Sequence, residues 1–154
     1  MSGERFTLDT NILVYSIDRT AGAKQGIAQE TIRLAAVGRC HLTLQAVSEF
    51  YAVVTRKGHL PAGVAAGLAR TWLDLFPCLP HSGAATRQAL DLAGAKQASY
   101  WDALLLCTAA EGGCGAILSE DMADGAVVAG VRIVNPFGAD ALTPAAMQVL
   151  APAG

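Results

Sequence analysis

The chain has few charged residues, few aromatic residues and no long apolar run. Charged residues make up 16% and aromatic residues 6% of its 154 positions, whereas hydrophobic residues make up 53%. An apolar content this high excludes an intrinsically disordered chain. No uninterrupted apolar stretch approaches the roughly 20 residues of a membrane helix, and the start of the chain lacks the pattern of a signal peptide. We therefore expect a single cytoplasmic domain without a membrane segment.

The residue patterns of common zinc, nucleotide and covalent-catalysis sites are also missing. The four cysteines form no C-x-x-C pair and the three histidines form no H-E-x-x-H motif, which disfavours a zinc site. There is no G-x-x-x-x-G-K-[ST] loop, and the glycines at 112–115 do not form G-x-G-x-x-G. Nucleotide-cofactor binding is disfavoured for this reason. The cysteines are expected to be buried free thiols in a reducing compartment.

Short apolar segments alternate with longer amphipathic ones. The sequence predicts strands at Phe6–Leu8, His41–Leu42, Cys78–Leu79, Ala116–Leu118 and Val131–Val134. It predicts helices at Ile12–Ile17, Gln25–Val37, Leu44–Lys57, Pro61–Leu75, Gly83–Gln97 and Trp101–Ala110. This alternation is typical of an α/β domain with a central, mostly parallel sheet and helices on both faces.

The end of the chain differs in composition from the rest. Residues 1–140 are predicted to form the domain, and residues 141–154 an Ala/Pro-rich C-terminal tail. A short helix begun by Thr143-Pro144 is expected inside this tail, because Thr is a good helix cap and Pro is tolerated at the first helical position. The last residues are expected to fray.

Four acidic residues occupy related positions along the predicted elements. Asp9 directly follows the first strand, and Asp121 comes shortly after the strand that ends at Leu118. In an open α/β sheet ligands bind at the carboxyl ends of the strands. Glu49 lies within a predicted helix beside its apolar stripe, and Asp102 heads an apolar helix, where an acid needs partners or a metal.

Each acid also has a simpler structural explanation. Asp9 has the side chain of a helix cap, although Asn11 offers the same function. Asp102 completes a capping-box pattern, Glu49 is compatible with a solvated helix flank, and Asp121 with an ordinary turn. Taken singly each acid is a weak indication, but four of them at the ends or inner faces of successive elements favour a shared site.

Converging carboxylates have a defined chemistry. They cannot all remain ionised in apolar surroundings without positive charge, and hard oxygen ligands suit Mg²⁺ or Mn²⁺. One or two such ions activate water in phosphodiester hydrolysis.

The net charge of −2 at first disfavours a nucleic-acid partner. If six acids share one cleft, however, the other 7 of the 13 stand against 11 Lys and Arg, a balance of +4. These six are Asp9, Asp18, Glu49, Asp102, Asp121 and Asp124.

Four segments resemble, in order, the acidic motifs of PIN-domain ribonucleases, and the chain looks most like the VapC-type toxins of bacterial toxin–antitoxin pairs. The segments are Leu8-Asp9-Thr10-Asn11-Ile12-Leu13-Val14-Tyr15, Ser48-Glu49-Phe50, Tyr100-Trp101-Asp102-Ala103-Leu104 and Leu118-Ser119-Glu120-Asp121-Met122. The likeness extends from about Phe6 to Phe137. Each motif alone is common, and the ordered set is fairly specific.

The resemblance implies a PIN fold and Mg²⁺- or Mn²⁺-dependent endonucleolytic cleavage of RNA. The catalytic and metal-binding quartet would be Asp9, Glu49, Asp102 and Asp121. Asn11 would orient Asp9, Ser119 and Asp124 would be supporting residues, and Asp18 would be peripheral. The family also implies a homodimer and a small antitoxin protein that blocks the acidic cleft. One departure is that few Lys and Arg residues lie near the motifs, so the RNA is left open.

Two other functions remain compatible with the sequence. The first is a catalytically silent PIN module that binds RNA or a partner protein without cleaving anything. The second is a small-molecule phosphohydrolase or phospho-acceptor domain. This second possibility is disfavoured because aspartyl-nucleophile phosphatases need an acid two residues after the first, where this chain has Asn11.

Overall fold

Strands and helices alternate along the chain in the computed structural model, which describes residues 3–152. The strands are β1 (Arg5–Leu8), β2 (Leu42–Thr43), β3 (Cys78–Leu79), β4 (Cys114–Leu118), β5 (Val127–Val128) and β6 (Val131–Val134). The helices are α1 (Thr10–Tyr15), α2 (Ala23–Ala35), α3 (Leu44–Arg56), α4 (Ala62–Leu75), α5 (Gly83–Gly94), α6 (Tyr100–Glu111) and α7 (Pro144–Leu150). The predicted α/β fold class is confirmed.

The main sheet has the strand order β1-β4-β6-β5. β1 pairs with β4 and β4 with β6 in parallel, as predicted. β2 and β3 form a second parallel pair. This pair adjoins β1, because the Phe6 nitrogen donates to the Arg39 carbonyl at 3.1 Å and the His41 nitrogen donates to the Phe6 carbonyl at 2.9 Å. Because β1 and β4 are paired in parallel, their carboxyl ends lie side by side.

The sequence prediction did not include β5, which is antiparallel to β6. The strand has only two residues, too few to show an alternating pattern. Its turn consists of Ala129 and Gly130, both with positive φ (54° and 78°), as a two-residue hairpin of the primed type requires. Such a turn is usually predicted from Asn, Asp or Gly at its first central position, where this chain has Ala129.

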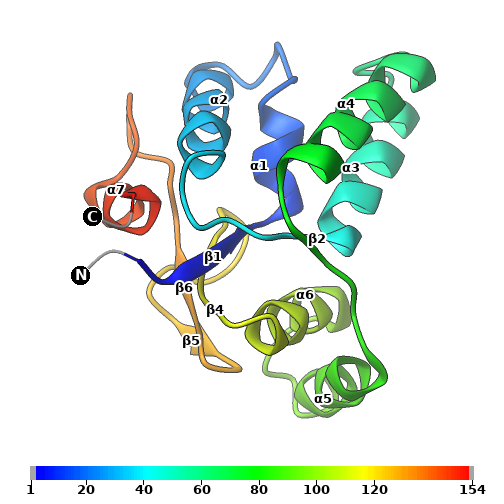
Figure 1. Cartoon of the computed structure of the whole chain (residues 1–154), viewed down its shortest axis with the longest axis vertical. Helices are drawn as coiled ribbons and strands as arrows, with labels where there is room; N and C mark the ends of the chain where they lie inside the picture. The colour runs from blue at the N-terminus through cyan, green and yellow to red at the C-terminus, as the bar shows by residue number, and fades with distance from the viewer. Residues whose placement is uncertain (1–2, 153–154) are drawn as a thin grey trace.

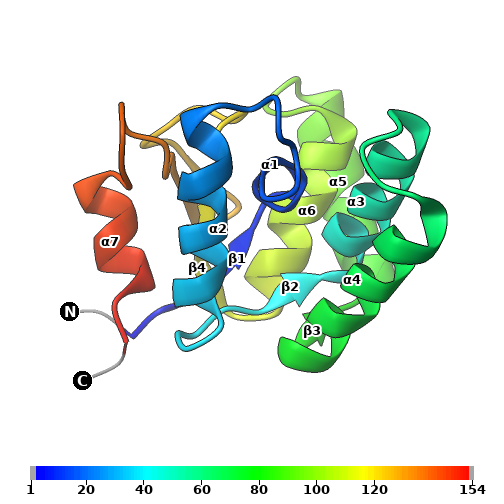
Figure 2. The ribbon, with the colours of Figure 1, turned by 90° about the horizontal axis from the view of Figure 1, so that it is seen from above.

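Helices cover both faces of the sheet. Figure 1 shows α1 and α2 on one side of β1 and β4, and α6, with α5 outside it, on the other. Seen from above, α3 and α4 lie beside β2 and β3 (Figure 2). Seven consecutive residues of α6, 103–109, are buried, which explains why this segment is apolar all round. Within residues 3–152, no helix has the length and apolar character needed to cross a membrane.

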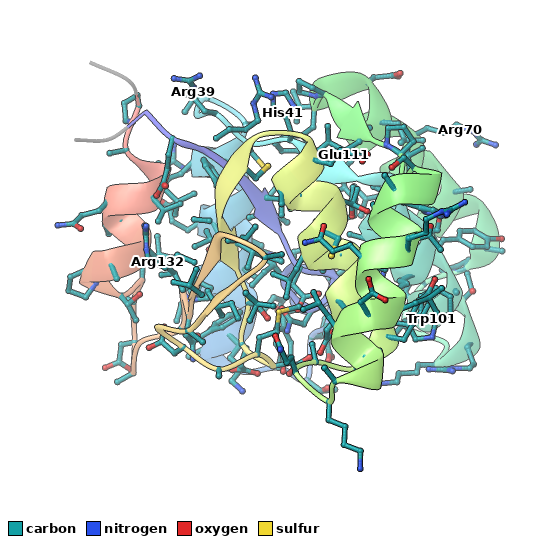
Figure 3. The ribbon with its side chains drawn as sticks, turned by 90° about the horizontal axis from the view of Figure 1, so that it is seen from below. Arg39, His41, Arg70, Trp101, Glu111 and Arg132 are labelled. Carbon is teal, nitrogen blue, oxygen red and sulfur yellow. The ribbon has the colours of Figure 1, made fainter. Side chains whose placement is uncertain are left out.

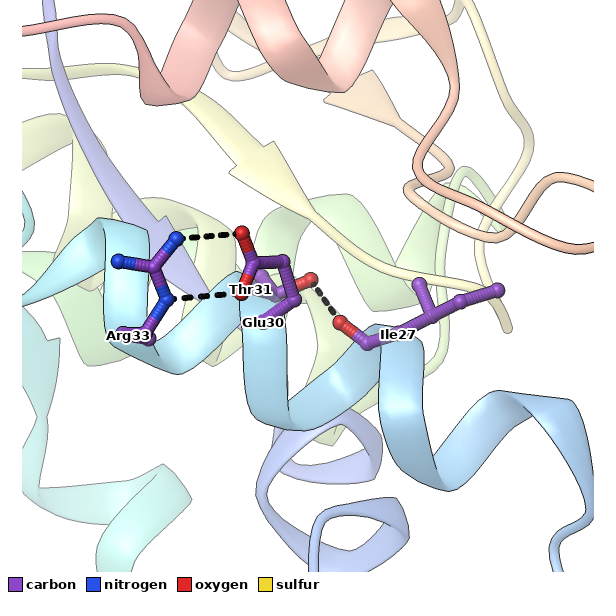
Figure 4. A network of polar contacts seen from close by, with 4 residues as sticks. All are labelled: Ile27, Glu30, Thr31 and Arg33. Atoms are coloured by element: carbon purple, nitrogen blue, oxygen red, sulfur yellow. Dashed lines mark hydrogen bonds and ion pairs between the residues drawn. The ribbon is translucent and has the colours of Figure 1, made fainter.

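Helix α2 shows how a short amphipathic helix separates its two faces. On the buried face, the Thr31 hydroxyl donates to the Ile27 carbonyl at 2.8 Å (Figure 4). On the outer face, Arg33 forms a two-pronged pair with Glu30 at 2.8 and 2.6 Å. Exposed pairs of this kind contribute little to stability, so α2 is held mainly by its buried face.

Most helix boundaries differ from the predicted ones by one to three residues. α2 begins at Ala23, two residues before Gln25. α5 ends at Gly94 instead of Gln97, because Lys96 takes a left-handed conformation with φ 58°. The nitrogen of Gln97 then donates to the carbonyl of Leu92 at 3.0 Å, a bond that closes the helix end.

The predicted helix at Thr143-Pro144 is present as α7. The Thr143 hydroxyl accepts from the Ala146 nitrogen at 3.3 Å and donates to the Asn135 carbonyl at 2.7 Å. Val149 and Leu150 are 4% and 2% exposed and belong to the main core. The division of the chain at residue 140 stays a prediction, and the end of the predicted frayed segment, residues 153–154, lies outside the described residues.

We predict that Leu150→Ala lowers the free energy of unfolding by about 2–5 kcal/mol, the usual range for removing a buried leucine. The neighbouring Gln148 is exposed, so Gln148→Ala should change it by less than about 0.5 kcal/mol. Urea unfolding followed by circular dichroism measures both. Equal stabilities of the two variants would contradict the placement of α7 in the core.

Candidate active site

Asp9 is fixed where β1 ends and α1 begins. Its backbone nitrogen donates to the Leu118 carbonyl at 2.9 Å, which extends the pairing of β1 and β4 by one residue. One carboxylate oxygen, Oδ1, accepts from the Thr10 nitrogen at 2.7 Å, and Oδ2 accepts from the Ser119 hydroxyl at 2.6 Å. Asp9 also caps α1. The capping role and the site role are therefore combined in one residue.

Glu49 is held by one hydrogen bond from α1 and one from its own helix. The Thr10 hydroxyl at the start of α1 donates to Oε2 at 2.9 Å. The Gln45 amide, one turn earlier on α3, donates to Oε1 at 2.9 Å and also reaches the Trp101 carbonyl at 3.0 Å. Glu49 thus points from α3 toward α1 and α6, and is not a solvated flank of its helix.

Asp102 and Asp121 complete the acidic group from two other directions. Asp102 lies in the first turn of α6, where its backbone nitrogen donates to the capping hydroxyl of Ser99 at 3.3 Å. Its side chain is partly buried. Asp121 is exposed in the loop after β4. The capping role predicted for the Ser99 motif is present, and Asp102 nevertheless faces the other acids.

A single pocket of about 350 Å³ collects these side chains. Asp9, Glu49, Asp102 and Asp121 all line it, together with Asn11 and Asp18. Lys57 and His59 line the same pocket and supply basic groups there. The structure therefore places all four acids singled out in the sequence around one space, at the edge of the sheet where the strands end.

The electrostatics of the pocket are unbalanced toward negative charge. Burial is the main cause that raises the pKa of Asp9 from its ordinary value of 3.8 to about 6. The hydrogen bonds from Ser119 and Thr10 oppose this rise, and the charges of Asp102 and Asp121 contribute to it. Burial likewise raises the pKa of Asp102, opposed by Ser99 and reinforced by Asp121 and Glu49. Each carboxylate makes its neighbours harder to ionise, and a bound cation would reverse this effect.

The donor set fits a hard divalent cation, although the ligands are not assembled around one point. Within the described part of the chain, no three His, Cys, Asp or Glu side chains are grouped closely enough to hold a metal ion. The acids nevertheless share one pocket. Both polar side-chain atoms of Asn11 in its wall are buried without a hydrogen-bond partner among residues 3–152. Carboxylate and amide oxygens are the ligands that Mg²⁺ and Mn²⁺ prefer.

The supporting residues differ in what they contact. Ser119 is fully buried and holds Asp9 directly. Asn11 reaches the pocket but makes no hydrogen bond to Asp9. Asp124 lies outside the pocket lining, where its carboxylate accepts from the Asn135 nitrogen at 2.9 Å. Asp18 is at the pocket margin, hydrogen-bonded to Thr20 and 3.9 Å from the His59 ring nitrogen.

Several contributing residues were not identified from the sequence. Tyr15 lines the pocket, and its hydroxyl donates to Glu120 Oε1 at 2.7 Å, while Lys24 pairs with Glu120 Oε2 at 2.8 Å. These two contacts form a clamp that fixes Glu120, which lies between Ser119 and Asp121. The four-residue spacing of Gln45 and Glu49 on one helix could have indicated their contact, but no local pattern connects Tyr15 with a residue 105 positions away.

The family model of the PIN domain matches residues 6–123, more than half of the chain. The chain belongs to the PIN-domain family. The resemblance stated from the sequence motifs is confirmed at this level. No curated protein matches this PIN domain in sequence.

Solved structures similar to this PIN domain come from toxin–antitoxin systems. VapC20 of Mycobacterium tuberculosis, described as a toxin that cleaves the sarcin–ricin loop, is 15% identical, with a TM-score of 0.62 over 75% of this chain and 89% of that one. VapBC2 of Rickettsia felis, bound to promoter DNA, is 16% identical, with a TM-score of 0.61 over 88% and 98%. A toxin–antitoxin complex of Klebsiella pneumoniae is 21% identical, with a TM-score of 0.58 over 81% and 93%. At these identities the likeness shows a shared fold.

We predict that, without metal, Asp9→Asn gains stability relative to wild type as the pH rises. Because the folded-state pKa of Asp9 is raised to about 6, the folded wild type loses stability as the pH rises from about 4 through about 6, where this carboxyl must ionise. The variant lacks this penalty. Its free energy of unfolding relative to wild type should increase by about 2 kcal/mol between pH 4.5 and 8.

Urea unfolding in EDTA at the two pH values measures this difference. Asp91→Asn is a matched control, since Asp91 is exposed on α5. A stability difference between wild type and Asp9→Asn that stays the same at both pH values would show that Asp9 is not a buried, hard-to-ionise acid.

Proposed function

We propose that this PIN domain is a Mg²⁺- or Mn²⁺-dependent endoribonuclease that hydrolyses RNA phosphodiesters. The observation that carries the proposal is the convergence of four carboxylates on one pocket at the carboxyl ends of β1 and β4. The pKa of both Asp9 and Asp102 is raised there. Acids that penalise each other in this way are stabilised by a divalent cation, which is the charge a nuclease site needs.

The pocket residues have different roles in the proposed reaction. Asp9 and Glu49 are held in fixed orientations by Ser119, Thr10 and Gln45, so their oxygens present a preorganised edge to a cation. Asp102 and Asp121 would complete the cation's surroundings. When bound, Mg²⁺ or Mn²⁺ lowers the pKa of a water and offsets the negative charge of the phosphodiester. Lys57 lines the pocket and offers positive charge to the phosphate backbone, and His59 lines it with a ring that can form hydrogen bonds.

The proposed biological role is based on the structural neighbours. VapC20 is named as a toxin that cleaves the sarcin–ricin loop, and other neighbours are solved as toxin–antitoxin complexes. These similarities support a role as the toxin of a type II toxin–antitoxin system, with a small antitoxin protein covering the acidic pocket. We also propose a homodimer as the working form. The cytoplasm, where cellular RNA is found, is the expected location.

We predict that the metal-stripped protein cleaves a mixed RNA pool only after Mn²⁺ or Mg²⁺ is added. Asp102→Asn should lower the cleavage rate by more than about 100-fold, because it removes a charged ligand from the site. The matched control Asp91→Asn should cleave like wild type. Gel electrophoresis of end-labelled RNA measures all three.

Two outcomes would contradict the proposal. Cleavage that persists in EDTA would remove the metal from the mechanism, and full activity of Asp102→Asn would remove the acidic quartet. Tight RNA binding without any product under saturating Mn²⁺ would instead favour a catalytically silent binding module.

A further inference from the structure

A second, larger cavity lies next to the acidic pocket. It has a volume of about 810 Å³, within the range of about 300–1,000 Å³ typical of small-molecule sites. Glu49 and Val53 line both spaces, so the two cavities are neighbours along α3. A nucleotide chain bound at the acidic pocket would have this second cavity beside it.

Trp101 forms an exposed aromatic wall of this cavity. Its side chain is 61% exposed, although it stands at the beginning of a helix that is otherwise deeply buried. The bond from Gln45 to its carbonyl holds the backbone of this residue, and its ring makes an edge contact with the Tyr100 ring, with 5.1 Å between ring centres. Figure 3 shows Trp101 near one end of the molecule, far from Arg39 and His41. Because this exposed ring lines a cavity, it offers a flat surface on which a base can stack.

Basic side chains border the same cavity. Arg56, at the end of α3, and His81, before α5, both line it and are exposed. Among residues 3–152 neither takes part in an ion pair. Two unpaired basic groups beside an apolar wall match a nucleotide, which joins a flat base to an anionic phosphate.

We propose that this cavity is a base-binding subsite, in which Trp101 stacks on an unpaired nucleobase next to the phosphodiester cleaved at the acidic pocket and Arg56 contacts the adjoining phosphate. The inference rests on the proposed nuclease function and assigns Trp101 and Arg56 as residues that bind its substrate. A base inside a duplex is stacked on its neighbours and cannot present its face to Trp101. Stacking tolerates any base, so this subsite selects for unpaired RNA more than for sequence.

A nucleotide fits the cavity better than a second copy of this chain does. The centres of protein–protein interfaces are depleted of charged residues, whereas Arg56, His81 and Glu49 all face this space. Covering it with a second copy would bury these groups. The alternative is kept as an outcome of the test below.

The test measures binding of a labelled five-nucleotide RNA to the full chain in EDTA, by fluorescence anisotropy. A sugar-phosphate chain of equal length without bases is the matched ligand. Trp101→Ala should weaken RNA binding roughly 5- to 100-fold and leave the base-free chain unaffected, while Trp101→Phe retains most of the affinity. Arg56→Ala should weaken both ligands. Leu90→Ala removes another exposed apolar side chain, on α5, and should change neither.

Unchanged RNA affinity of Trp101→Ala, or no RNA binding by the wild type, would overturn the subsite. Conversion of a wild-type dimer to a monomer by Trp101→Ala, seen by light scattering, would also overturn it and assign the cavity to a second copy. Cleavage with added Mn²⁺ separates the two proposals. If RNA is cleaved equally well without Trp101, the nuclease proposal holds and the subsite is wrong. If RNA binding depends on Trp101 but no cleavage occurs, the subsite holds and the nuclease proposal is wrong.

Discussion

The site depends on the pairing of the ends of β1 and β4. This pairing is carried one residue beyond β1 by the bond from the Asp9 nitrogen to the Leu118 carbonyl, and Ser119 then donates directly to the Asp9 carboxylate. Two segments 110 positions apart in sequence thereby form one unit with a buried acid at its centre. Burial of that carboxylate is costly unless positive charge is supplied. The fold thus creates, at the edge of its parallel sheet, a position that favours a cation.

Much of the fold could be predicted from the sequence because its elements are regular. The apolar run before Asp9, the all-round apolar pattern of α6 and the cap at Thr43 are local signals, and the structure has the corresponding elements. Elements set by tertiary contacts or by unusual backbone were missed. β5 has two residues and a turn through Ala129, and α5 ends early because Lys96 is left-handed. Neither feature leaves a pattern in the sequence around it.

The acids of the site could be predicted, but their surroundings could not. Asp9, Glu49, Asp102 and Asp121 stand out because carboxylates are unusual beside apolar segments. Their hydrogen-bond partners are ordinary residues whose importance comes from long-range packing: Thr10 reaches Glu49, Gln45 links α3 to α6, and the Tyr15–Glu120–Lys24 clamp fixes the loop of Asp121. The supporting roles of Asn11, Ser119 and Asp124 all came from the resemblance, and it is Ser119 whose hydroxyl donates to the Asp9 carboxylate.

The central claim is that the pocket binds a divalent cation through Asp9. The most direct measurement is calorimetric titration of the metal-stripped protein with Mn²⁺ between pH 5 and 8, beside Asp9→Asn. The pKa of Asp9 near 6 predicts binding at pH 8 that weakens as the pH falls below about 6, because the cation must then displace a proton. It also predicts loss of this binding in the variant. Binding that is equally tight in wild type and Asp9→Asn, or no binding at pH 8, would contradict the account.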